Sequence, residues 1–75
     1  MMAILDGQTV WDCVDAAKKH IDRDPSLAVY MVRDMRIVEE AGLRDLAWAL
    51  ADNGANTTPD EARGFFEALD KGRPQ

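Results

Sequence analysis

Apolar residues recur at helical spacing in four stretches of the chain. The first stretch, residues 9–23, has apolar side chains three or four positions apart, with charged residues between them: Val10, Val14, Ala17 and Ile21. This spacing predicts an amphipathic helix. Asp24 and Pro25 end it, because a residue before proline avoids the helical region and proline suits the first turn of the next helix.

The second stretch predicts one long helix over residues 25–41, with Asp24 as its N-cap and Gly42 closing it. The run LAVYMV within it also suits a strand by its β-branched content. Helix is favoured because the apolar pattern continues through Met35, Ile37 and Val38.

Two shorter helices follow. The third covers residues 43–52, with the stripe Leu43, Leu46, Ala47 and Leu50, and the sequence DNG stops it with Asn53 or Gly54 in a left-handed conformation. The fourth begins at TTPDEA, where Thr58 and Glu61 form a capping box around Pro59. Its apolar face is Ala62, Phe65, Phe66 and Leu69, and it ends at Lys71 and Gly72.

These elements predict an all-α fold, a small four-helix bundle with short loops, as a single domain over residues 1–75. The first residues, Met1, Met2, Ile4 and Leu5, are too apolar for a free tail, so we expect an N-terminal arm that packs on the helices or on a second copy. A chain of 75 residues hides only about 60% of its unfolded surface, so partners or self-association often help such a domain.

The amino-acid composition limits the classes of partner that we expect this chain to bind. Acidic residues outnumber basic ones by 14 to 9, and a net charge of -5 repels nucleic acid and suits a basic protein surface. No apolar run approaches the roughly 20 residues that cross a bilayer, and the start lacks the basic residues of a signal peptide. We therefore expect a cytoplasmic protein without a membrane or nucleic-acid partner.

The segment IVEEAGLRDLAWAL resembles the helix-turn-helix of Lac-type repressors, with Ile37, Ala41, Gly42 and Leu43 at apolar and turn positions. The resemblance implies a DNA-binding transcriptional regulator. The segment departs from the pattern at Val38, where a small residue is usual, and at Trp48, where a Val or Ile pivot is usual. Only Arg44 on the outward face can read base edges, and Asp45 lies beside it. The sequence therefore favours two packed helices over a DNA-reading pair.

Catalytic and metal-binding patterns are weak. The single histidine, His20, and the single cysteine, Cys13, lie on one predicted helix about 10.5 Å apart along its axis, so they cannot form a nucleophile pair. We expect Cys13 to be buried and His20 to lie on the surface. The loop that begins at Asp52 lacks the spacing of an EF-hand, and there is no glycine-rich phosphate loop. We expect no enzyme, cofactor or metal site.

The second predicted helix carries more apolar surface than one buried stripe needs. It is either central in the bundle or it supplies an intermolecular contact. Asp34 interrupts this surface, as an exposed edge residue or as a carboxylate that meets a basic partner. Trp11 and Trp48 lie off the main stripes, where they cover the edge of the core or dominate binding, and Arg44 is placed to stack on Trp48. The candidate partner-binding residues are Trp11, Tyr30, Met31, Asp34, Ile37 and Trp48.

The leading functional hypothesis is a small acidic interaction protein that regulates, adapts or inhibits another protein and forms a homodimer. Single-domain inhibitors of this size are typical of phages and mobile elements. The alternative is the helix-turn-helix transcriptional regulator.

Overall fold

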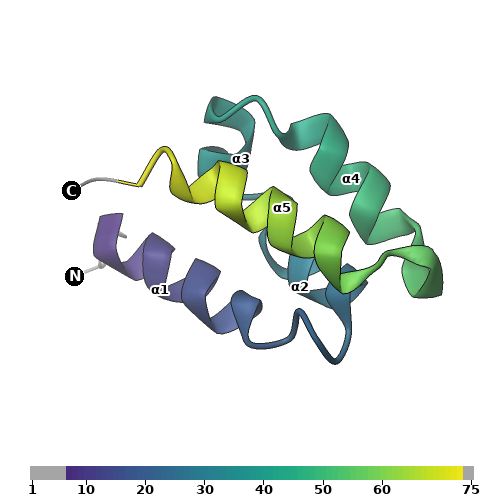
Figure 1. The fold of residues 1–75 in the computed structure, drawn as a ribbon. Coiled ribbons are helices and arrows are strands. Elements are labelled where there is room, and N and C mark those ends of the chain that lie inside the picture. Colours follow the sequence, from purple (N-terminus) through teal and green to yellow (C-terminus); the bar gives the residue numbers. More distant parts are fainter. Residues whose placement is uncertain (1–6, 74–75) are drawn as a thin grey trace.

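The computed structural model describes residues 7–73, and helices joined by turns make up this part of the chain, without a strand (Figure 1). It contains α1 (Gly7–Lys18), α2 (Pro25–Val32), α3 (Arg36–Glu40), α4 (Arg44–Asp52), the 3-10 turn η1 (Gly54–Asn56) and α5 (Pro59–Asp70). The all-α prediction is confirmed. The four-helix bundle is supported in part, since the described residues contain five α-helices, two of which, α2 and α3, lie within the second predicted helix. The expected N-terminal arm lies outside the described residues.

The helix α2 is the centre of the fold, because it packs against α1, α4 and α5. In Figure 1, α1 and α5 run in opposite directions along one side of the molecule, and α4 lies on the other side of α5. The core between these helices is aliphatic and aromatic: Trp11, Val14, Ala17, Ile21, Ala28, Val29, Val32, Val38, Ala47, Leu50, Ala62, Phe65, Phe66 and Leu69. Of the two alternatives for the second predicted helix, the central position is the one that α2 occupies, and an intermolecular contact stays a prediction.

The start of α5 forms as its sequence predicts. The Thr58 hydroxyl accepts a hydrogen bond from the Glu61 backbone N–H at 3.2 Å, and the Glu61 carboxylate accepts one from the Thr58 backbone N–H at 2.9 Å. This reciprocal capping box satisfies two backbone donors that the helix itself cannot. It directs Phe65 and Phe66 into the core, where their rings meet edge to face at 5.1 Å.

The long helix predicted over residues 25–41 is wrong. The chain leaves the helix after Val32, and Met35 adopts an extended conformation with ψ 145° before α3 begins. Neither glycine nor proline marks this break, and the apolar period continues across it because α3 also buries Val38. Because of this break, α2 and α3 run in different directions over the core. The periodicity of apolar residues along one helix axis cannot predict such a change of direction.

Both glycine turns predicted from the sequence, at Gly42 and at Gly54, are present in the structure. Gly42 has φ 74°, and the Leu43 N–H donates to the Val38 carbonyl at 3.0 Å while the Gly42 N–H donates to Glu39. These two bonds form a Schellman motif, for which glycine is the usual residue. Gly54 after α4 also takes a positive φ, as one of the two predicted choices.

Three local predictions fail. The first helix ends at Lys18 and not at residue 23, and the chain continues in tighter turns such as the Ile21 N–H donating to the Lys18 carbonyl at 3.1 Å. Cys13 is exposed, because Trp11 and Val14 define the buried side of α1. Leu46, placed on the buried stripe of the third helix, is exposed as well.

Buried hydroxyl groups bind the end of α4 to α2 and to the segment between η1 and α5. The Ser26 hydroxyl donates to the Ala51 carbonyl at 2.9 Å, and the Thr57 hydroxyl donates to the Leu50 carbonyl at 2.7 Å. Both carbonyls belong to the last turn of α4, where a helix leaves carbonyl groups without its usual internal bonds, and the Leu50 carbonyl also accepts from the Asn53 N–H at 3.4 Å. The Ser26 bond connects the start of α2 with α4, on one side of the groove between them.

Candidate interaction surface

The helix α2 contains no charged residue, although one side of it faces solvent. Leu27, Tyr30 and Met31 lie on that side with 40, 54 and 43% of their surface exposed. A surface helix normally places charged or polar side chains opposite its buried stripe. These three residues, the α2 face, therefore form an apolar surface that the fold does not cover.

The opposite side of α2 is already buried, so Leu27, Tyr30 and Met31 cannot lie in the core as well. Ala28, Val29 and Val32 are completely buried, and they fill the centre of the core between three other helices. The start of the helix is held by the Asp24 carboxylate, which accepts a hydrogen bond from the Leu27 N–H at 3.2 Å. One apolar side of α2 is thus buried in the core, and the other apolar side is exposed to solvent.

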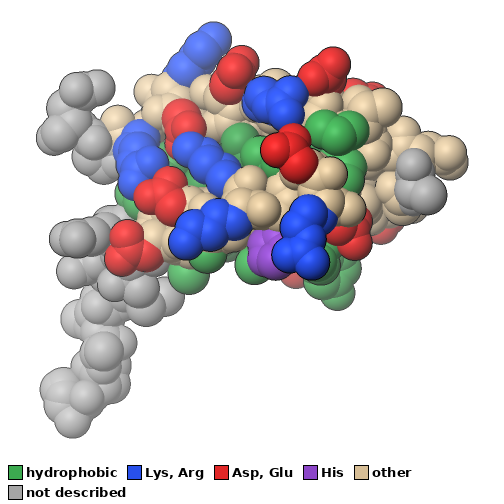
Figure 2. Space-filling model, turned by 60° about the horizontal axis from the view of Figure 1, so that its bottom comes forward, with side chains coloured by type: hydrophobic (Ala, Val, Ile, Leu, Met, Phe, Trp, Pro, Cys, Tyr) green, Lys and Arg blue, Asp and Glu red, His purple; other side chains and the backbone are tan. Residues whose placement is uncertain are grey.

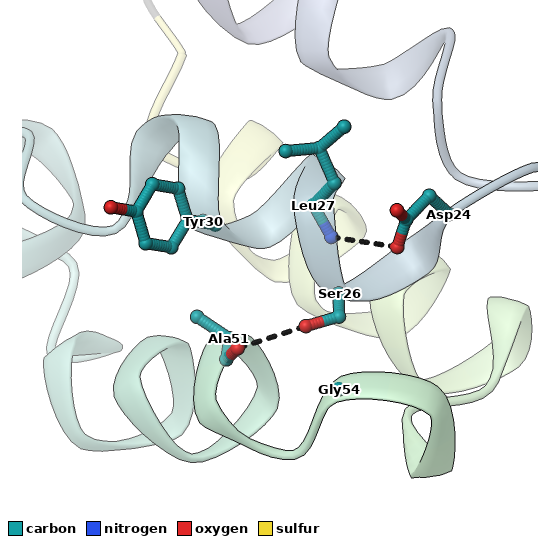
Figure 3. Close-up of a pocket in the computed structure, with 6 residues that line it drawn as sticks. All are labelled: Asp24, Ser26, Leu27, Tyr30, Ala51 and Gly54. Atoms are coloured by element: carbon teal, nitrogen blue, oxygen red, sulfur yellow. Dashed lines mark hydrogen bonds between the residues drawn. The ribbon is translucent and has the colours of Figure 1, made fainter.

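A shallow groove of about 480 Å³ lies beside the α2 face (Figure 3). Leu27, Tyr30 and Ala51 contribute apolar walls, and Asp24, Ser26 and Gly54 complete its lining. Figure 3 shows Asp24 at one end of the groove and Tyr30 at the other, with the Ser26–Ala51 hydrogen bond on its α4 side. The groove is an apolar channel with one carboxylate at its end.

Arg33, just beyond α2, lies between two aromatic rings. Its guanidinium carbon is 4.5 Å from the centroid of the Tyr30 ring and 3.9 Å from that of the Trp48 ring. Both distances are within the range of cation–π attraction. Arg33 thereby connects the α2 face with α4, so the Trp48 ring lies next to this face.

Carboxylates surround Arg33. Its Nη1 lies 3.6 Å from the Asp52 carboxylate, and its Nε lies 3.8 Å from the Asp34 carboxylate, which is too long for a hydrogen bond. The side chain of Arg33 is only 17% exposed, whereas those of Asp34 and Asp52 are 74 and 68% exposed. The cation is thus turned inward and the acids outward at this edge of the surface.

The six residues predicted to bind a partner separate into two groups. Tyr30 and Met31 lie on the α2 face, and Trp48 and Asp34 adjoin it through Arg33. Trp11 and Ile37 lie elsewhere and line a separate cavity of about 210 Å³ between α1, α3 and α5.

Trp11 belongs to the core, with 6% of its surface exposed, and it lies apart from the α2 face; its role in partner binding stays a prediction. Arg44 does not stack on Trp48 as suggested. Arg33 does so, while Arg44 approaches Glu39 at 3.4 Å. Sequence reasoning missed Leu27 and Arg33, although the uncharged run PSLAVYMV was a signal for the first of them.

The helix-turn-helix resemblance extends to the backbone turn but not to the chemistry of its outward face. α3 has only five residues, and the donor group that suits base edges, the Arg44 guanidinium, is engaged by Glu39. Asp45 lies next to Arg44 and is exposed. This face therefore presents a carboxylate where a DNA reader needs hydrogen-bond donors.

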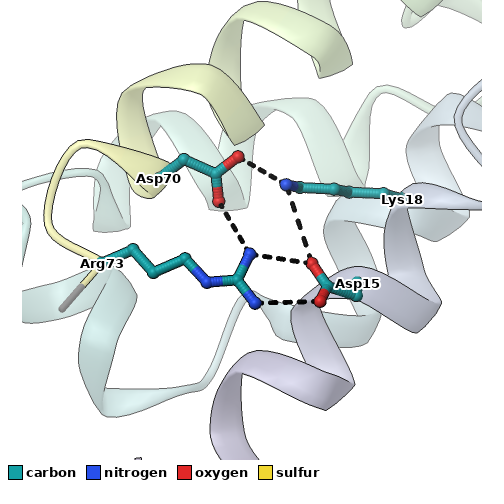
Figure 4. Close-up of polar contacts among 4 residues, drawn as sticks. All are labelled: Asp15, Lys18, Asp70 and Arg73. Atoms are coloured by element: carbon teal, nitrogen blue, oxygen red, sulfur yellow. Dashed lines mark hydrogen bonds and ion pairs between the residues drawn. The ribbon is translucent and has the colours of Figure 1, made fainter. Parts of the chain in front are cut away.

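An ion-pair cluster connects the ends of α1 and α5 (Figure 4). The Arg73 guanidinium donates two hydrogen bonds to the Asp15 carboxylate, at 3.0 and 2.9 Å, and Lys18 donates to Asp70. The Arg73 hydrogen bonds lower the pKa of Asp15 below its ordinary value of 3.8, and burial opposes them only in part. The same pair raises the pKa of Arg73. Arg73 also lies 5.1 Å from the Trp11 ring, so the cluster covers the outer edge of the core.

Charges of both signs alternate over the side of the molecule that carries α1. Figure 2 shows Lys and Arg side chains next to Asp and Glu side chains there, without a broad patch of one sign. Ion pairs between α1 and α5 contribute to this pattern, and Arg63 of α5 also donates to Asp22, in the turns after α1, at 2.9 Å. This side therefore neutralises itself and offers less to a partner than the α2 face does.

Residues 7–73 contain no group of three or more His, Cys, Asp or Glu side chains arranged to hold a metal ion. None of the described helices is long and apolar enough to cross a membrane. Comparisons with protein-family models, with curated proteins and with solved structures find no match for this chain.

Proposed function

We propose that this chain is a small protein-interaction module that regulates, adapts or inhibits a partner protein, and that the partner binds on the α2 face. The observation that carries this proposal is the combination of no charge in α2 with three large apolar side chains exposed on it. Trp, Tyr and Arg are the residues that most often dominate binding energy, and Tyr30, Arg33 and Trp48 lie in one stack beside this face.

The stack supports the proposal in a second way. A side chain that is already held in place loses less conformational entropy when a partner covers it. The Arg33 guanidinium lies over both aromatic rings, and its side chain is only 17% exposed. This contact between the rings and Arg33 supports a binding role for them that isolated exposed residues such as Leu46 lack.

The experiment is affinity capture from an extract of the source cells with matched baits. Met31→Glu places a charge on the α2 face, and Leu46→Glu makes the same change on α4, at a residue that is equally exposed. Leu46 lies about 200° around α4 from Trp48, which puts it on the opposite flank. We expect the wild type and Leu46→Glu to retain the same protein and Met31→Glu to lose it, with unchanged circular dichroism. Equal capture by all three baits would reject the proposal.

The transcriptional-regulator alternative has its own test. The engaged Arg44 and the exposed Asp45 support a protein partner over DNA. A gel-shift assay at low salt and micromolar protein should give no sequence-selective complex, because binding to phosphates depends on unpaired cations. A selective shift that is lost in Arg44→Ala would establish the alternative.

A further inference from the structure

The charges around the α2 face are predominantly negative. Asp24 lies at the start of α2, and Asp34 and Asp52 lie beyond its end, next to Arg33. Two cations adjoin this region: Arg33, whose side chain is only 17% exposed and lies over two rings, and Arg44, which pairs with Glu39. A partner therefore meets an apolar centre with an acidic margin.

The groove adds a specific shape to this charge pattern. Its walls at Leu27, Tyr30 and Ala51 are apolar along its length, and the Asp24 carboxylate stands at its end (Figure 3). One oxygen of Asp24 accepts the Leu27 N–H, and among the described residues no Lys or Arg forms an ion pair with this carboxylate. A long side chain with an aliphatic stem and a cationic head fits such a channel, since the stem covers apolar surface while the head reaches the acid.

From the groove and the margin together, we infer that the α2 face binds a partner segment that is both apolar and basic. Apolar side chains of the segment lie on Leu27, Tyr30 and Met31, and one Lys or Arg lies along the groove with its head at Asp24. This inference rests on the proposed function and adds the chemical class of the partner to it.

Charge also separates this occupant from a second copy of the chain. A twofold dimer formed through the α2 face would use the same patch twice. It would bring the acidic margins of two chains together, because Asp34 and Asp52 are exposed while each Arg33 is turned inward. Like charges that face each other across an interface oppose association. A basic segment instead turns the same carboxylates into attractive contacts.

The probes are three synthetic peptides. The first is an amphipathic helix of leucine and lysine, the second replaces its lysines by glutamate, and the third contains the residues of the first in a scrambled order without an apolar face. Each is titrated into isotope-labelled protein and followed by nuclear magnetic resonance. We expect the leucine–lysine helix to bind, and to shift the signals of Leu27, Tyr30, Met31 and the Trp48 indole. The glutamate and scrambled peptides should bind at least tenfold more weakly.

The sharpest variant is Asp24→Asn. Asparagine caps a helix as well as aspartate does, so α2 keeps its start while the charge is removed. We expect Asp24→Asn to weaken the leucine–lysine peptide about two- to fivefold, as for an exposed ion pair, and to reduce the salt dependence of binding. Asp45→Asn, which removes an exposed charge of α4 that is not part of the groove lining, should leave the affinity unchanged.

Several outcomes overturn the inference. They are binding of the glutamate peptide as tightly as the lysine peptide, equal binding of the scrambled peptide, no binding of any peptide, and an Asp24→Asn variant that behaves as wild type. Self-association of the free protein through the shifted residues would assign the face to a second copy. Each of these results leaves the capture experiment with Met31→Glu and Leu46→Glu unaffected, so failure of the inference and failure of the proposed function are distinguishable.

Discussion

The guanidinium of Arg33 lies 3.9 Å from the centre of the Trp48 ring, although the two residues belong to different helical regions. Arg33 follows the last turn of α2, and Trp48 lies in the middle of α4. The contact therefore connects these elements at the solvent edge of the core. It involves an aromatic ring that is 36% exposed, which links the packing of the fold to the surface proposed for binding.

Arg33→Lys should lower the free energy of unfolding by about 1 kcal/mol, because an ammonium group cannot lie flat against two rings as a guanidinium does. Chemical denaturation followed by Trp fluorescence measures the change. Arg36→Lys is the control, since Arg36 is highly exposed and contacts only Glu40 among the described acids. Equal stability of the two variants would mean that the stack contributes nothing specific.

Phe66→Ala should destabilise the domain by about 3–5 kcal/mol, because it removes a ring that is 1% exposed and packs against Phe65. A loss of this size is a large part of the stability of a small domain and should leave much of the protein unfolded. Circular dichroism during thermal melting measures it. Leu46→Ala, at an exposed position, should change stability by less than about 0.5 kcal/mol. A Phe66→Ala protein that melts like wild type would contradict the core described above.

The Asp15–Arg73 pair should make stability depend on acid pH. Because the pKa of Asp15 is lowered in the folded state, its stabilising effect is present above the unfolded pKa and is lost as pH falls through the folded pKa. The difference in the free energy of unfolding between wild type and Asp15→Asn should thus shrink between about pH 5 and pH 2.

The effect should be small and weaker in high salt, since the Asp15 side chain is 45% exposed. Glu67→Gln, an exposed position of the same fold, is the matched control and should show no comparable trend. A wild-type to Asp15→Asn difference that is constant with pH would show that the pair is not formed in solution.

Met31→Glu should leave the protein helical, because Met31 is 43% exposed and its replacement buries no charge. The homodimer predicted from the sequence stays a prediction, and sedimentation at tens of micromolar tests it. If the wild type sediments as a dimer and Met31→Glu as a helical monomer, the α2 face is the dimer contact. A wild type that is monomeric leaves the face for a foreign partner. Loss of helix in Met31→Glu would contradict the exposed position of this residue.

Local chemistry determined the parts of the fold that depend on a few neighbouring residues. The capping box at Thr58 and Glu61 and the turns at Gly42 and Gly54 require particular side chains or backbone angles at fixed positions. The apolar face of α5 also followed directly, because Phe65 and Phe66 belong to a single helix with one buried side. Such features are readable from the sequence since their energy comes from contacts within a few residues.

Tertiary packing decided the features that the periodicity left open. The pattern across residues 25–41 is helical throughout, yet the chain breaks at Met35, because both α2 and α3 find buried positions in different directions. The same pattern could not say which apolar residues of α2 remain outside. Only the placement of α1, α4 and α5 around α2 leaves Leu27, Tyr30 and Met31 exposed. Periodicity records how apolar a helix is, whereas the neighbours of the helix determine which of its sides is left for a partner.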